Sequence, residues 1–235
     1  MKGYKVAFKK AFPYTIPVLT GYLFIGIAFG VMYADKGYNF LWAILMSLLV
    51  YAGSAQYLAV NFFVPGFSLL QVVVLTLMVN VRHIFYGLSL LEKFNKMEKK
   101  RWYMIFSLTD ETYSLLCTTK IPKGVDENKF LFAVAIMNQS YWVIGSMLGG
   151  LAGTLISFNS EGIDFAMTAL FVVILIEQWM NKKSRIPAII GILLSIVSIF
   201  IFGTDKFILP AMLMMVFVLF VARKKLDDEG VKSCQ

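Results

Sequence analysis

The sequence predicts an all-α integral membrane protein, a single polytopic helical bundle of about six full crossings plus two partial, broken or re-entrant segments. Composition is the first reason: hydrophobic residues make up 59% of the chain, charged residues 15%, and the mean hydropathy is +0.73, more than a water-soluble domain carries. Charge distribution is the second, since the 45 residues from Gly37 to Val81 contain no Asp, Glu, Lys or Arg. That run is long enough for two helical crossings of about 20 residues each.

Charge-free stretches place the expected membrane segments along the chain. Apolar residues run continuously in them, which favours helices over the alternating pattern of a β-barrel strand. We expect segments near residues 14–34, 40–63, 67–91, 130–156, 164–180, 186–203 and 207–222, with 102–119 as a candidate eighth. No linker separates domains, so residues 1–235 should form one membrane transport domain, with a cytoplasmic N-terminal stub (1–13) and a cytoplasmic tail (223–235).

Basic residues predict the orientation of the chain. They cluster at the N-terminus, in residues 93–101, in residues 182–185 and at the start of the tail, and by the positive-inside rule all four clusters should be cytoplasmic. The loop 157–163 has no Lys or Arg and should lie outside. Because an odd number of segments separates the N-terminus from residues 93–101, one of those segments should be re-entrant or broken.

Residues 102–119 carry two adjacent carboxylates, Asp110 and Glu111. On a continuous helix, the polar face would consist of Ser107, Asp110, Glu111, Ser114 and Thr118. Each carboxylate costs about 3 kcal/mol in lipid, so this face should point towards water or the bundle interior. A helix lying on the cytoplasmic surface is the alternative.

The sequence lacks the residue patterns of common enzymes and ATP-driven pumps. His83 is the only histidine, so a two-histidine zinc motif cannot form, and no P-loop, G-x-S-x-G or G-x-G-x-x-G pattern is present. Cys117 and Cys234 lack metal-ligand spacing, so no metal and no other cofactor is expected. The net charge of +8 comes from basic residues beside membrane segments, which indicates topology and not nucleic-acid binding.

Small and polar residues interrupt the middle of the second predicted segment, which reads Tyr-Ala-Gly-Ser-Ala-Gln from residue 51 to residue 56. If the helix opens there, Gly53, Ser54 and Gln56 can bind a zwitterionic solute together with freed backbone groups, as broken helices do in secondary transporters. An unbroken helix whose small residues pack against a neighbour is the commoner alternative.

Polar and ionisable residues also lie deep in the third predicted segment. Arg82 is nine residues from the end of that segment, roughly 13 Å at 1.5 Å per residue, and snorkelling relieves part of this burial. Because ionisable groups inside a membrane are functional candidates by default, Asn80 and Arg82 join the substrate-binding candidates. His83 can take a proton near neutral pH and joins Asp110 and Glu111 as candidates for proton coupling or gating. A structural hydrogen bond is the alternative for His83.

The segment 130–156 combines polar side chains with a glycine-lined face. Asn138 and Gln139 lie in its first half and are further substrate-binding candidates. Glycines at four-residue spacing mark one face of this segment and of the first one: Gly26, Gly30, Gly145, Gly149 and Gly153. Such spacing predicts close helix approach, so these glycines are candidates for helix packing or for a partner interface.

Taken in order, these stretches resemble the AzlC family, the large subunits of branched-chain amino acid exporters. The resemblance rests on residues 26–30, Ala-Gly-Ser-Ala-Gln at 52–56, Asn-Val-Arg-His at 80–83 with Tyr86, Thr-Asp-Glu-Thr at 109–112, the glycine helix at 142–153, and Gly-Ile-Asp-Phe-Ala at 162–166. These stretches span nearly the whole chain. By motif, the resemblance points to Gly53, Ser54, Gln56, Asn80, Arg82, His83, Asp110 and Glu111 as site residues.

The resemblance also implies a function. It implies a secondary transporter subunit that exports valine, leucine and isoleucine, with methionine as a further candidate, across a bacterial plasma (inner) membrane. Proton coupling is the implied mechanism, and a small hydrophobic AzlD-type subunit is the implied partner. The alternatives are a channel or transporter for another small solute, and a non-transporting membrane assembly subunit. Polar clusters in mid-membrane favour transport over a pure assembly role.

Overall fold

The computed structural model describes residues 2–63, 66, 68–155, 165, 168, 172, 175–176, 179, 185–203, 207, 210–211, 213–215, 217–218 and 221. These residues form helices and no strands, as the all-α prediction requires. The chain divides into two compact units, Met1–Met167 and Thr168–Gln235. Most of the predicted segments 164–180 and 207–222 lies outside the described residues.

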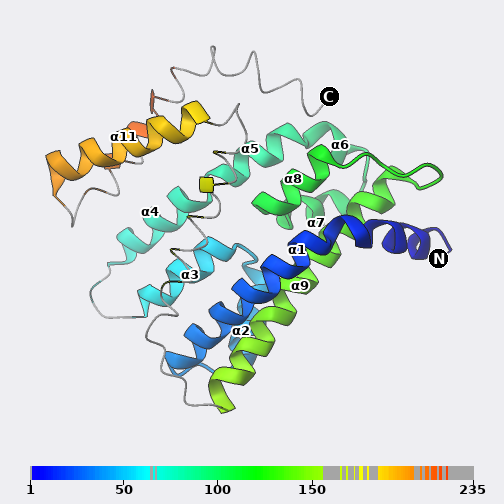
Figure 1. The fold of residues 1–235 in the computed structure, drawn as a ribbon, viewed down its shortest axis with the longest axis horizontal. Helices are drawn as coiled ribbons and strands as arrows, with labels where there is room; N and C mark the ends of the chain where they lie inside the picture. Colours follow the sequence, from blue (N-terminus) through cyan, green and yellow to red (C-terminus); the bar gives the residue numbers. More distant parts are fainter. Residues whose placement is uncertain are drawn as a thin grey trace. The chain divides into compact units, whose positions relative to one another are not determined.

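Up to residue 155, the helices of the first unit are α1 (Lys2–Asp35), α2 (Phe40–Leu49), α3 (Gly53–Phe62), α4 (Leu69–Asn80), α5 (Arg82–Ser89), α6 (Leu91–Asn95), α7 (Lys100–Phe106), α8 (Asp110–Thr118) and α9 (Glu127–Leu155) (Figure 1). In the second unit, α11 (Arg185–Phe202) matches the predicted segment 186–203. Among the described residues, three helical stretches are long and apolar enough to cross a membrane: Gly3–Asp35, Leu69–Ser89 and Glu127–Leu155.

The first helix is longer than the sequence predicts. It begins at Lys2 and continues to Asp35, so residues 2–13, expected as a separate stub, are part of the same helix as the first membrane segment. Lysine has good helix propensity, and the basic residues near the N-terminus therefore do not interrupt the helix. Pro13 and Pro17 also lie inside it.

The second predicted segment is broken in the middle. It consists of α2 and α3, each of 10 residues, and therefore each is only about 15 Å long. Tyr51, between them, has a φ of 37°, a left-handed conformation that ends a helix and that non-glycine residues rarely adopt. The unbroken helix, which was the commoner alternative, is therefore wrong, and the opening near Gly53 is present.

Residues 102–119 are also interrupted, and the prediction of one continuous polar face is wrong. α7 ends at Phe106 and α8 starts at Asp110 after Thr109, whose side chain accepts a hydrogen bond from the Thr112 backbone N–H. The hydroxyl-bearing N-cap starts a new helix in place of a continuing one. As a result, Ser107 is buried at the interruption, whereas Ser114 and Thr118 are exposed.

The helices α1 and α9 pack along most of their length (Figure 1). At Gly26, an added Cβ would lie 3.1 Å from the Gly145 Cα, and at Gly30 it would collide with backbone atoms of Ser146, Gly149 and Gly150. The Gly149 and Gly153 positions are equally filled by α1. The predicted glycine faces therefore meet each other within this chain, and we call their contact the glycine seam.

The glycine seam fixes the relative direction of its two helices. Gly26 lies against Gly145, Gly30 against Gly149 and Ala34 against Gly153, so the numbers rise together and the helices are parallel. The start of α9 is consequently on the same side as the start of α1. The basic residues independently predict the start of α1 to be cytoplasmic.

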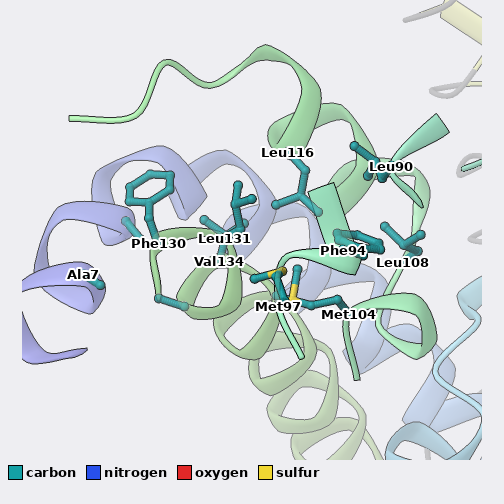
Figure 2. Close-up of a cluster of buried hydrophobic side chains, with 13 residues drawn as sticks. Ala7, Leu90, Phe94, Met97, Met104, Leu108, Leu116, Phe130, Leu131 and Val134 are labelled. Carbon is teal, nitrogen blue, oxygen red and sulfur yellow. The ribbon is translucent and has the colours of Figure 1, made fainter. Parts of the chain in front are cut away.

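A hydrophobic cluster joins the short helices to the start of α9, as Figure 2 shows. Leu90 and Phe94 contribute from the α5–α6 region, Leu116 comes from α8, and Phe130 and Val134 come from α9; all five are almost completely buried. Burial of this kind stabilises by about 1.5–3 kcal/mol per large side chain. This cluster holds the start of α8, and with it Asp110 and Glu111, in place against α9.

Candidate functional site

The α2–α3 break exposes backbone groups that an intact helix would pair. Geometry leaves the first N–H groups of α3 without an intrahelical partner, and no side chain caps them, because the N-cap is Ala52. At the other side of the break, α2 ends at Leu49, and its last carbonyls lack the N–H partners that a continuing helix would supply; one of them, that of Leu48, accepts a hydrogen bond from Gln139 instead. The N-terminal end favours an anion and the C-terminal end favours a cation. The break therefore presents groups for both charges of a zwitterion.

Arg82 connects this break to α8. Its Nη2 donates to Ser54 Oγ at 2.6 Å, and its Nη1 forms an ion pair with Asp110 Oδ2 at 2.7 Å. The Tyr86 hydroxyl donates to the other carboxylate oxygen of Asp110 at 2.8 Å. Ser54, Arg82 and Asp110, which were predicted from separate stretches of sequence, therefore meet. Together with Tyr86 we call them the arginine bridge. The Arg82 and Asp110 side chains are 30% and 23% exposed, so the bridge is accessible.

Gln56 is fully buried and uses both ends of its amide. The Trp142 Nε1–H donates to Gln56 Oε1 at 2.8 Å, and Gln56 Nε2 donates to Ser47 Oγ at 3.2 Å. Ser47 in turn donates to Ser146 Oγ at 2.8 Å. The Gly53 Cα lies against the same indole ring, since an added Cβ would be 3.0 Å from Trp142 Cη2. Gln56 thus holds α2 and α3 against α9, while Gly53 allows the close approach.

Glu111 belongs to a line of hydroxyl groups that joins three helices. The Tyr22 hydroxyl on α1 donates to Glu111 Oε2 at 2.7 Å and lies 2.6 Å from Thr109 Oγ1. Thr109 Oγ1 is 3.0 Å from Thr112 Oγ1, which also accepts a hydrogen bond from Asn138 Nδ2 at 3.0 Å. We call these five residues the hydroxyl line. It brings the predicted residues Glu111 and Asn138 together.

Two buried polar atoms of this region have no well-formed hydrogen bond among the described residues: the Tyr51 hydroxyl and Asn138 Oδ1. Tyr51 is 2% exposed, and its hydroxyl lies near those of Thr112 and Tyr22. An unpaired buried polar group costs about 1–3 kcal/mol, which a solute or water can recover. The break and the hydroxyl line therefore form one continuous polar region.

The remaining predicted site residues have mainly structural contacts. His83 Nδ1–H donates to the Asn80 carbonyl at 3.0 Å, and Asn80 Nδ2 donates to the Thr76 carbonyl at 2.9 Å, both within the same helical stretch. Gln139 Nε2 donates to the Leu48 carbonyl at 3.2 Å and its Oε1 accepts from Tyr103 at 2.7 Å. Gln139 therefore ties α7 and α9 to the end of α2. The glycines are at the seam, away from these polar groups.

Sequence reasoning missed three residues of the polar region: Tyr22, Ser47 and Tyr103. A signal was present for Tyr22, which lies four residues before Gly26 and hence on the face that packs against α9. Ser47 and Tyr103 carried no such signal. A single hydroxyl on an apolar helix is common, and only the tertiary contact distinguishes it.

The AzlC protein family matches residues 17–156, which contain α1 from residue 17 onwards, all of α2 to α9 and all of the polar region. The chain belongs to the AzlC family. The residues that match the family make up more than half of the chain, and the resemblance seen in the short motifs is confirmed.

Two relatives match this AzlC family member over almost its full length, and a third matches 72% of it. It is 46% identical over 225 residues to the branched-chain amino acid transport protein AzlC of Bacillus subtilis, with 96% of this chain and 89% of the relative covered. An uncharacterized membrane protein of Haemophilus influenzae is 40% identical, with 95% and 92% covered. The inner membrane protein YgaZ of Escherichia coli is 26% identical, with 72% of each chain covered. No solved structure matches the chain.

Proposed function

We propose that this protein is a secondary transporter subunit that exports valine, leucine and isoleucine, with methionine as a further substrate, across the bacterial plasma membrane. The name of the Bacillus subtilis relative, a branched-chain amino acid transport protein, supports the substrate class. The arginine bridge beside a broken helix is the structural observation that carries the proposal. Export, proton coupling and a small AzlD-type partner subunit are parts of the proposal.

The arginine bridge suits recognition of an amino acid carboxylate. A guanidinium binds a carboxylate with two parallel hydrogen bonds, and here it already does so in part with Asp110. A substrate carboxylate can take the place of Asp110 or Ser54 on Arg82 and accept further hydrogen bonds from the first N–H groups of α3. Arg82 is therefore the expected carboxylate anchor, and Ser54 and Asp110 hold it in position until substrate arrives.

An apolar side chain has a hydrophobic environment next to this anchor. The buried cluster around the break contains Phe29, Tyr51, Tyr57 and Trp142, with Tyr22 at its edge towards Glu111. A branched aliphatic side chain gains about 0.8 kcal/mol per methylene group moved from water into such surroundings. Branched-chain amino acids should therefore bind better than alanine or polar amino acids.

Topology and partnership complete the proposal. We propose six full crossings and two partial segments, of which α2–α3 is one and α7–α8 the other, with both termini in the cytoplasm. The apolar stretch Leu69–Ser89 buries none of its apolar window within the first unit. This stretch is the surface on which we place the small hydrophobic subunit, since helices in lipid associate through side-chain packing.

Isoleucine transport in proteoliposomes tests the proposal. The chain, purified together with its small subunit, should exchange internal unlabelled isoleucine for external labelled isoleucine, and valine and leucine should compete better than alanine. Replacing Arg82 by Gln should weaken binding by about 1.5–3 kcal/mol, roughly tenfold to hundredfold, because one hydrogen bond to a charged group is lost. Absence of isoleucine binding by the unmodified complex would refute the substrate assignment. Full exchange by the chain alone would refute the need for a partner.

A further inference from the structure

Asp110 and Glu111 are neighbours in sequence but have different surroundings. Asp110 uses one carboxylate oxygen in the ion pair with Arg82 and the other to accept from Tyr86. Glu111 accepts one side-chain hydrogen bond, from Tyr22, and within the described part of the chain it has no cation at ion-pair distance. The two carboxylates are therefore suited to different protonation states.

The difference has a direct electrostatic consequence. An ionised carboxylate inside a membrane protein is costly unless a cation or several hydrogen bonds accompany it. Asp110 has both, in Arg82 and Tyr86. Glu111 has neither a cation nor a second side-chain donor, so it is stable as a neutral acid until a cation reaches it. A proton and the ammonium group of an amino acid can both meet this requirement.

The hydroxyl line can accommodate Glu111 in either state. Tyr22 and Thr109 each have one hydroxyl proton, and if Tyr22 donates to Glu111 while Thr109 donates to Thr112, no proton remains for the 2.6 Å contact between Tyr22 and Thr109. One of the outer bonds must therefore be reversed. If Thr112 donates to Thr109 and Thr109 to Tyr22, then Glu111 is ionised. If Glu111 donates to Tyr22, then it is protonated, and every contact along the line still contains one proton.

The charged and titratable groups around Glu111 come from several elements: Tyr22 from α1, Tyr51 from the α2–α3 break, Arg82 and Tyr86 from α5, and Asp110 from α8 itself. Arg82 and Asp110 neutralise each other. The tyrosines are neutral near pH 7. Glu111 is consequently the member of this group whose charge can change while the other groups keep theirs.

We propose that Glu111 is the residue for which the coupled proton and the substrate ammonium compete, while Arg82 holds the substrate carboxylate. This inference rests on the proposed function and names the residue that couples substrate export to proton movement. Arg82, which holds Asp110, lies close enough to Glu111 for its charge to act on that carboxylate, so a substrate carboxylate on Arg82 leaves the ammonium of the same molecule close to Glu111. Binding of substrate then releases a proton from Glu111, and rebinding of a proton displaces the ammonium. Mutually exclusive binding of this kind exchanges protons for substrate, so an inward proton gradient drives the substrate outward.

Proton release during isoleucine binding is the direct test. In weakly buffered solution with a pH dye, isoleucine added to the purified complex should acidify the medium. Its affinity should fall about tenfold for each pH unit below the titration of Glu111, since one proton competes. Glu111→Gln should release no proton and bind isoleucine weakly with little dependence on pH. Glu92→Gln, the same change on an exposed residue of α6, should behave as the unmodified protein does.

Further probes separate this inference from the proposed function. The 2-oxo acid of leucine has the carboxylate but lacks the ammonium, so any binding through Arg82 should release no proton. Asp110→Asn should change isoleucine affinity but keep proton release, because Glu111 is intact. If the unmodified complex binds isoleucine without releasing a proton, or if Glu111→Gln keeps the pH dependence, the assignment of Glu111 is wrong while the transport function stands. If isoleucine does not bind at any pH, the proposed function itself fails.

Tyr22→Phe gives an independent check that leaves Glu111 in place. Hydrogen bonds to a charged acceptor are stronger than those between neutral groups, so removing the Tyr22 hydroxyl destabilises ionised Glu111 more than protonated Glu111. The pH midpoint of isoleucine binding should therefore move upwards in Tyr22→Phe. An unchanged midpoint would contradict the role of the hydroxyl line, even if Glu111→Gln does not fold.

Discussion

Replacing Gln56 by Leu tests whether this buried amide is structural. The two side chains have similar volumes, so the change mainly removes the acceptor of the Trp142 Nε1–H and the donor to Ser47. Ser47 keeps its bond to Ser146, whereas the indole N–H is left buried without a partner. Leaving one such donor unpaired costs about 1–3 kcal/mol. In a chain of this size, that corresponds to a fall in Tm of roughly 2–12 °C.

Thermal unfolding of the purified protein in detergent provides the measurement, and a double-mutant cycle provides the control. Trp142→Phe removes the indole N–H, so the combination with Gln56→Leu leaves no unpaired donor at this position. The double variant should lose less stability than the sum of the single variants, with a coupling of about 0.5–3 kcal/mol. Isoleucine affinity, measured well below the Tm of each variant, should change little in Gln56→Leu.

Two results would refute this reasoning. Additive losses in the cycle would show that the 2.8 Å contact between Trp142 and Gln56 does not stabilise the α2–α3 break. A large loss of isoleucine affinity at unchanged Tm would show that the amide binds substrate directly, as the sequence motif first predicted. Either result would require a different account of how the two half-helices are held against α9.

Three further predictions concern the seam, the orientation and the anchor. Gly149→Ala should prevent normal assembly, because its Cβ would collide with the Ile27 backbone, whereas Gly21→Ala, with nothing within 4 Å, should be tolerated; size-exclusion profiles and Tm report both. The orientation can be tested by cysteine labelling in a background that lacks Cys117 and Cys234. A cysteine at Asn159 should react with an impermeant thiol reagent from outside and one at Lys183 should not, whereas equal labelling of both would contradict the orientation. Both positions lie outside the described residues. Ser54→Ala should change isoleucine affinity by about 0.5–1.5 kcal/mol at unchanged Tm, since it removes one hydroxyl partner of Arg82; an unaltered titration curve would count against the bridge.

Hydrophobicity and charge were sufficient to predict the fold class, because lipid requires long apolar helices whatever their tertiary packing. They were not sufficient to locate the breaks. The helix interruption at Tyr51 depends on Gln56 and Gly53 meeting Trp142, a contact between residues far apart in sequence. The interruption before Asp110 depends on the N-cap residue Thr109. This local signal is visible in the sequence, but the prediction of one continuous helix gave more weight to the amphipathic periodicity of residues 102–119.

The site residues divide in the same way. Ser54, Arg82 and Asp110 could be singled out because polar and ionisable groups are rare in apolar segments, and the structure places them in contact. Their mutual arrangement could not be predicted without the fold. Gln139 and His83 were chosen on the same grounds, yet Gln139 bonds to the Leu48 carbonyl and the Tyr103 hydroxyl, and His83 bonds to the Asn80 carbonyl. Polarity alone does not separate a side chain that ties helices together from one that faces a solute.

The glycine seam also restricts which parts of the protein can move. At Gly26, Gly30 and Gly149 the backbones of α1 and α9 touch without intervening side chains, so neither helix can slide or rotate against the other without backbone collision. We therefore expect the pair to act as a rigid frame during the transport cycle. Opening towards one side of the membrane and then the other would be left to the shorter helices around the frame, with Tyr51 as a hinge. A pair of spin labels on α1 and α9 should then report one constant distance while labels on α3 and α8 report two.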